Sequence, residues 1–166
     1  METLNKAATI STVIFLLSFF NLTQCNGNDT LSTKGKDLKL NIHSFQAGLT
    51  SIPVIGGLVS ISAKDGQEGV IIKGEIHPTV NNESLVINLK DFKMLVGDKE
   101  FTPATADVTR HNKSSLESIQ WPSGHSNTLD KNDFPASISI MFLVTKNQKK
   151  TLIITGGNPI LLSTNN

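Results

Sequence analysis

Apolar and polar residues alternate along most of the chain with a period of two. In a β-strand successive side chains point to opposite faces, so this alternation places one face on a core and the other in water. The clearest runs cover residues 38–43, 58–62, 70–76, 85–89, 138–144, 152–154 and 160–162. Turn-forming pairs separate them at Asp65-Gly66, Asn81-Asn82, Gly97-Asp98, Asn147-Gln148 and Gly156-Gly157. Short strands with such turns between them predict an all-β fold, an antiparallel β-sandwich over residues 37–166.

The longest stretch without strand patterning covers residues 109–132. Ser114 and Glu117 form a capping pair that predicts about one helical turn over residues 115–120, which Pro122 would end. Long loops on a rigid sandwich often carry binding residues. Residues 109–132 are therefore a candidate binding loop, with Trp121, His125 and Asp130 as its candidate contacts, and the alternative is a solvated connector.

The first residues form a separate segment. An apolar run of 14 residues covers positions 7–20 and follows Lys6. A membrane-spanning helix needs about 20 apolar residues, whereas the apolar part of an export signal needs only about 7–15. The length predicts a signal peptide over residues 1–24, with an uncleaved anchor or a buried helix as the alternative.

The apolar run ends close to the only cysteine, in the sequence Leu22-Thr23-Gln24-Cys25. This segment resembles the lipobox of bacterial lipoproteins, in which a leucine stands three residues before the acylated cysteine. The resemblance implies that Leu22 is read by the processing machinery and that Cys25 carries the lipid. Gln24 departs from the small residue that the family prefers there. Residues 25–36, polar and with two glycines, are then expected to be a flexible, lipid-anchored tether.

A second resemblance covers residues 87–103 and a segment over residues 142–154 that would form a closing hairpin. Both resemble the immunoglobulin-like (telokin-like) domains of bacterial lipoproteins. The resemblance implies an extracytoplasmic, immunoglobulin-like sandwich and supplies no catalytic residues. Residues Lys146–Lys150 are the densest group of basic residues, and we predict that they form the polar tip of that hairpin.

Composition narrows the classes of function. Lys and Arg total 15 against 14 Asp and Glu, so the net charge is +1 and no basic field for nucleic acid is expected. A single cysteine allows no intramolecular disulfide, so the fold must depend on its core.

Motifs that carry chemistry are scarce. The histidines His43, His77, His111 and His125 are separated by 34, 34 and 14 residues, which is not the spacing of a local metal site. Distant histidines can still converge on zinc or copper. Asp130-Lys131-Asn132-Asp133 lacks the glycine and distal glutamate of a calcium loop and reads as a turn before the strand at residue 138. No cofactor is expected.

Two classes of function remain. The first, which we favour, is a non-enzymatic lipoprotein of the cell envelope, anchored on the outer side of a membrane through Cys25. Its sandwich would bind a protein or envelope partner. The second is a small metal-handling protein or hydrolase that uses His111 and His125. A soluble secreted or periplasmic sandwich is the alternative for location.

Overall fold

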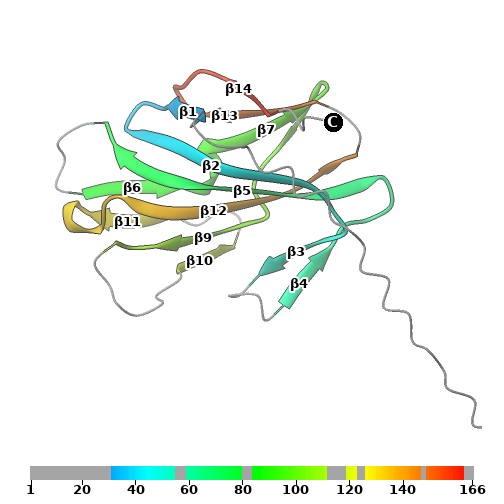
Figure 1. The fold of residues 1–166 in the computed structure, drawn as a ribbon, viewed down its shortest axis with the longest axis horizontal. Coiled ribbons are helices and arrows are strands. Elements are labelled where there is room, and N and C mark those ends of the chain that lie inside the picture. Colours follow the sequence, from blue (N-terminus) through cyan, green and yellow to red (C-terminus); the bar gives the residue numbers. More distant parts are fainter. Residues whose placement is uncertain are drawn as a thin grey trace, which may run out of the picture.

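The computed structural model describes residues 31–54, 59–79, 84–111, 119–122, 126–146 and 149–162, and it is an antiparallel β-sandwich (Figure 1). The predicted fold class is confirmed. No helix among the described residues has the length and hydropathy to span a membrane.

One layer is a six-stranded sheet with the order β1-β2-β5-β12-β9-β10, in which all neighbours are antiparallel. Its strands are β1 (Leu31–Lys34), β2 (Leu38–Leu49), β5 (Gln67–Pro78), β12 (Ala136–Thr145), β9 (Thr105–Thr109) and β10 (Ile119–Pro122).

The opposite layer contains a four-stranded sheet with the order β14-β13-β7-β8 and a separate pair, β11-β6. Two 3₁₀ turns, η1 (Leu89–Asp91) and η2 (Lys131–Asp133), precede β7 and β12. Two further strands, β3 (Ser51–Val54) and β4 (Val59–Ser62), form a separate hairpin. The strands of the second layer are β6 (Ser84–Asn88), β7 (Phe92–Val96), β8 (Lys99–Phe101), β11 (Ser126–Asp130), β13 (Lys150–Ile154) and β14 (Ile160–Leu162).

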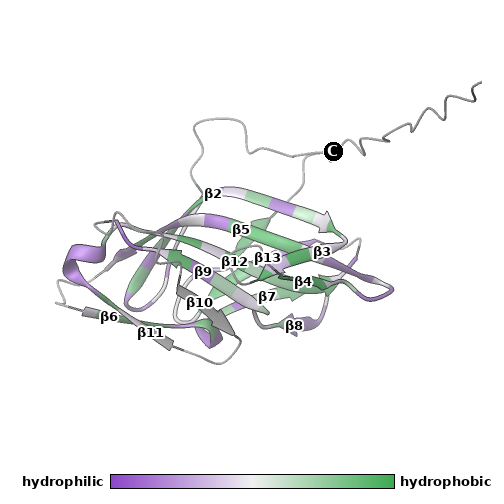
Figure 2. Ribbon diagram, turned by 90° about the horizontal axis from the view of Figure 1, so that it is seen from below, coloured by the Kyte–Doolittle hydropathy of each residue, from purple (hydrophilic) through white to green (hydrophobic). Residues whose placement is uncertain are grey.

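The core lies between the two layers. Ile72, Ile140 and Phe142 point inward from the six-stranded sheet, and Phe92 and Leu152 point inward from the four-stranded sheet. All five are fully buried, because the period-two alternation of each strand sends its apolar set to the same face. The hydropathy colouring of Figure 2 follows this pattern, with green concentrated on β5, β12, β13 and β7.

The expected tether is too long at its C-terminal end. Leu31–Lys34 form β1 and pair with β2, so the folded domain includes these residues and does not begin near Asp37. Thr33 is buried, and its hydroxyl donates a hydrogen bond to the carbonyl of Asn158 at 2.9 Å. The sequence Leu-Ser-Thr-Lys has little period-two pattern. It forms a strand because it pairs with β2 and because Thr33 bonds to the distant Asn158.

The expected closing hairpin over residues 142–154 is wrong. β12 pairs with β5 and β9, whereas β13 pairs with β7 and β14, so the chain crosses from one layer to the other between them. Lys150, expected at an exposed tip, is buried and forms an ion pair with Glu68 of β5, with 2.8 Å between Nζ and Oε1. The buried carboxylate gives the lysine a partner inside the sandwich.

Part of the predicted helical turn is also wrong. Ile119 and Gln120 lie in β10 and pair with Val108 and Asp107 of β9, while residues 115–118 lie outside the described residues. Backbone pairing with the sheet edge prevails over the local capping signal. The described part of residues 109–132 therefore includes β10, β11 and the start of η2 and is not one irregular loop.

The predicted turns at Asp65-Gly66, Gly97-Asp98 and Gly156-Gly157 are confirmed. Gly66 and Gly97 have φ of 79° and 61°, the left-handed region that glycine adopts without strain. The predicted turns at Asn81-Asn82 and Asn147-Gln148 lie outside the described residues.

Candidate functional site

The outer face of the six-stranded sheet is divided into an apolar end and a polar end. At the apolar end Ile71 of β5 and Met141 of β12 point away from the main core, and Ile52 of β3 covers them. The hairpin can lie this close because residue 69 is glycine: a Cβ there would stand 2.7 Å from Cγ2 of Ile52. The remaining outer face has no covering element among the described residues.

The polar end of this face consists of rows of residues that pair across four strands. One row joins Asn41 of β2, Glu75 of β5, Ser137 of β12 and Thr109 of β9. Residues that pair directly share one face of the sheet. We define the polar face as this row and its neighbours: Lys39, Asn41, His43, Ser44, Lys73, Glu75, His77, Asp107, Thr109, Ser137 and Ser139.

A β-bulge positions the first of the two histidines on the polar face. The register between β2 and β5 shifts between Ile42, which faces Gly74, and Ser44, which faces Lys73, so His43 is the extra residue. A bulge bends its strand and redirects a side chain. Gly74 permits the close approach of the strands, because a Cβ there would overlap the carbonyl oxygen of Asn41.

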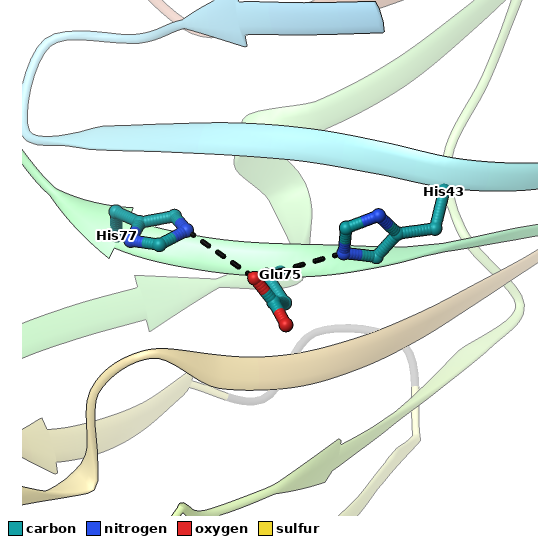
Figure 3. A network of polar contacts seen from close by, with 3 residues as sticks. All are labelled: His43, Glu75 and His77. Atoms are coloured by element: carbon teal, nitrogen blue, oxygen red, sulfur yellow. Dashed lines mark ion pairs between the residues drawn. The ribbon is translucent and has the colours of Figure 1, made fainter. Parts of the chain in front are cut away.

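His43, Glu75 and His77 form a cluster at the centre of this face (Figure 3). Nε2 of each imidazole lies 3.6 Å from the same carboxylate oxygen, Oε2 of Glu75. Figure 3 shows the two rings approaching the carboxylate from opposite sides. Glu75 and His77 share the face because they are two residues apart on β5.

The distances leave hydrogen-bonding capacity unused. A separation of 3.6 Å is longer than a hydrogen bond, so these contacts are charge pairs that exist when the imidazoles are protonated. The side chains of His43, Glu75 and His77 are 50%, 38% and 35% exposed. The carboxylate of Glu75 and the ring of His43 are therefore accessible to a partner, whereas Nε2 of His77 is buried and accepts or donates no hydrogen bond among the described residues.

The cluster does not have the arrangement of a metal centre. Within the described part of the chain, no group of three or more His, Cys, Asp or Glu side chains is placed to hold a metal ion. His111, which follows β9, is exposed, and its backbone N–H donates to the carbonyl of Asp133 at 3.2 Å. His125, its expected partner, lies outside the described residues.

The expected binding residues do not form one loop in the described part. Trp121 is in β10 and pairs with Ala106 in the six-stranded sheet, whereas Asp130 ends β11 and pairs with Ser84 in the other layer. Leu22 and Cys25, like His125, lie outside the described residues. The binding loop therefore remains a prediction without a described site.

The turn at Asp130-Lys131-Asn132-Asp133 is confirmed as a structural turn. Asp133 is buried, and its carboxylate accepts a hydrogen bond from the backbone N–H of Asp130 at 2.9 Å. The same carboxylate oxygen, Oδ2, lies 3.6 Å from Nε of Arg110. These contacts fix the chain where it leaves β11 and enters β12.

Sequence reasoning did not identify His43, Glu75 and His77 as a cluster. The alternation along β5 could have placed Glu75 and His77 on one face. The approach of His43 depends on the pairing of β2 with β5 and on the bulge, which no local pattern reveals.

Solved structures with similar folds come from bacteria. An uncharacterized β-sandwich protein of Clostridium difficile superposes with a TM-score of 0.51 at 9% identity, over 82% of this chain and 92% of that chain. A candidate lipoprotein of Bacillus subtilis gives 0.45 at 13% identity, over 83% of this chain and 39% of that chain. A conserved hypothetical protein of Bacillus anthracis gives 0.45 at 6% identity, over 81% and 94%. No family model and no curated protein matches the chain. The similarity to the Clostridium difficile protein, at 9% identity, shows the fold alone.

Proposed function

We propose that this chain is an extracytoplasmic lipoprotein, anchored in a membrane through Cys25, whose non-catalytic sandwich binds a protein or envelope partner. The observation that carries the proposal is the position of the only cysteine. It follows an apolar segment of signal length and precedes β1, the first strand that the structure describes, which begins at Leu31.

The anchor would hold the domain close to the membrane. Five residues separate Cys25 from Leu31. Six steps of about 3.3–3.6 Å span about 20 Å when fully extended. A diacylated cysteine with this short connection would retain the sandwich at the membrane surface, since two acyl chains give stable anchoring and one gives marginal binding.

Replacing Cys25 by alanine is expected to release the protein from membranes. Wild type should remain in the membrane pellet after carbonate washing and enter solution only with detergent, whereas Cys25→Ala should lose most of this retention. Gln24→Ala, which brings the segment closer to the lipobox pattern, is the matched control and should remain anchored. Wild-type protein that is soluble without detergent would refute the anchor and favour a secreted sandwich.

The polar face is the surface that we propose for the partner. Its four fixed charges, Lys39, Lys73, Glu75 and Asp107, balance, which suits hydrogen bonding more than long-range attraction. The His43–Glu75–His77 cluster lies within it, and its Glu75 carboxylate and His43 ring are exposed to a partner. The covered, apolar end of the same sheet offers no such groups.

The triple variant His43→Ala/Glu75→Ala/His77→Ala is expected to lose partner binding and keep its fold. Exposed ion pairs contribute about 0–1 kcal/mol, so the free energy of unfolding should change by no more than about that amount. Chemical cross-linking on intact cells should yield partner adducts with wild type and few with the variant. Lys93→Ala/Glu100→Ala, which removes an exposed ion pair on the other layer, is the control. Equal adducts from both variants would exclude the polar face.

A further inference from the structure

The β3–β4 hairpin presents an apolar face that the sandwich only partly covers. Ile52 pairs with Ile61 and Val54 pairs with Val59, so these four side chains share one face of the hairpin. Ile52 is fully buried against the six-stranded sheet, whereas Val59 and Ile61 on β4 are 51% and 39% exposed. Figure 2 shows the hydrophobic colouring continuing from β5 onto β3.

The exposed part of this face is held in place by its buried part. Ile52 packs with Ile71 and Met141, so β3 is fixed on the sheet. Among the described strands β4 pairs only with β3, and all four of its residues are exposed. The surrounding sequence carries no charge: residues 40–63 contain no Asp, Glu, Lys or Arg. The two exposed aliphatic side chains of this strand, Val59 and Ile61, suit an apolar environment better than water.

The direction of β1 places Leu31 toward the end of the sandwich at which the β3–β4 hairpin lies. β1 is antiparallel to β2, with Leu31 opposite Ile42 and Lys34 opposite Lys39. Leu31 is therefore the end of β1 nearer the hairpin. From Ile42, β2 runs to Leu49 before the hairpin begins, a distance of at most about 23 Å at 3.3 Å per residue.

This distance, which ends at Leu49 two positions before the hairpin, is comparable to the reach of the anchor, about 20 Å from Leu31 to Cys25. Acyl chains on Cys25 and the side chains of β4 can therefore meet the same membrane surface. We propose that Val59 and Ile61 are a membrane-contacting surface, which seats the anchored sandwich on the lipid bilayer. The inference rests on the lipid anchor proposed above and adds a second contact to it.

The test places a probe on the hairpin of the lipidated protein. Val59→Cys is labelled with an environment-sensitive fluorophore and reconstituted in vesicles of phosphatidylethanolamine and phosphatidylglycerol. Because the sequence has one cysteine and acylation blocks its thiol, only position 59 takes the label. Val86→Cys is the matched control, since Val86 is 60% exposed on β6 in the other layer.

We expect the emission at position 59 to move to shorter wavelength in vesicles and to be quenched by nitroxide-labelled lipids, with neither effect at position 86. Absence of lipid quenching at position 59 overturns the proposal. So does a wavelength shift that persists in detergent or grows with protein density, because that indicates a second copy or another protein on β4.

Failure of the anchor is recognised separately. If Cys25 is not acylated, intact mass shows a Val59→Cys variant without acyl mass, which carries two fluorophores if Cys25 is retained and one if Cys25 is removed with the signal peptide, and the lipoprotein function is refuted. Lipid quenching at position 59 on adding the same vesicles to this soluble protein would still support the surface, and its absence would overturn it.

Discussion

Replacing Lys150 by alanine is expected to lower the free energy of unfolding by about 3–5 kcal/mol. Nζ of Lys150 lies 2.8 Å from Oε1 of Glu68, and both side chains are 8% exposed. The two residues belong to different layers, on β13 and β5. Removing the ammonium group leaves a buried carboxylate without its counter-charge, which costs more than the loss of an exposed pair. Equilibrium urea denaturation of wild type and variant measures the difference.

Lys93→Ala is the matched control for this prediction. Nζ of Lys93 lies 2.7 Å from Oε1 of Glu100, but these side chains are 37% and 49% exposed. Solvent screens such a pair, so the expected loss is about 0–1 kcal/mol. The double variant Glu68→Leu/Lys150→Met, which removes both buried charges, should regain most of the stability. Similar losses for Lys150→Ala and Lys93→Ala would show that burial of the Glu68–Lys150 pair has no energetic consequence.

Replacing Gly74 by alanine is expected to destabilise the sandwich by about 1–3 kcal/mol and to displace His43. A Cβ at position 74 would overlap the carbonyl oxygen of Asn41, a backbone atom that cannot rotate away. β2 would have to shift at the bulge that positions His43 beside Glu75. Urea denaturation measures the change in the free energy of unfolding, and the NMR resonances of the His43 ring report its displacement.

Two controls accompany the Gly74→Ala variant. Ser137→Ala changes an exposed position of the neighbouring strand β12 and should alter the free energy of unfolding by about 0.5 kcal/mol at most. The ring resonances of His111, exposed beyond the end of β9, should stay unchanged in Gly74→Ala. Wild-type stability together with unmoved His43 resonances would contradict the role of Gly74 in the bulge.

Strand positions could be predicted because the alternation is strong where a strand has one buried face. Residues 160–162 form β14 as expected, and the run at 85–89 becomes β6 with its last residue in η1. In both, some apolar residues are buried in the core, such as Leu85, Ile87 and Leu162, although Val86 and Leu161 are exposed.

The assignment of strands to layers could not be predicted in the same way. A polar segment such as residues 146–150 can close a hairpin or cross between two sheets, and its composition does not distinguish them. Lys150 illustrates the difficulty, because a lysine counts as an exposed residue in any pattern and becomes buried only through Glu68, which is 82 positions away (150 − 68). β1 was missed for a related reason, since its buried Thr33 depends on Asn158.

The candidate site depends on the same long-range information. Glu75 and His77 share a face of one strand, which is a local property. His43 joins them only because β2 pairs with β5 and bulges at that residue. The sequence presents His43 and His77 as two isolated histidines 34 positions apart.

The lipid anchor is the central claim, and intact mass spectrometry of the protein from the membrane fraction of its native host tests it most directly. We predict a species that begins at Cys25 and carries the additional mass of acyl chains, absent from cells that express Cys25→Ala. A soluble product with unmodified residues, whose mass is the same whether or not Cys25 is replaced, would contradict the account.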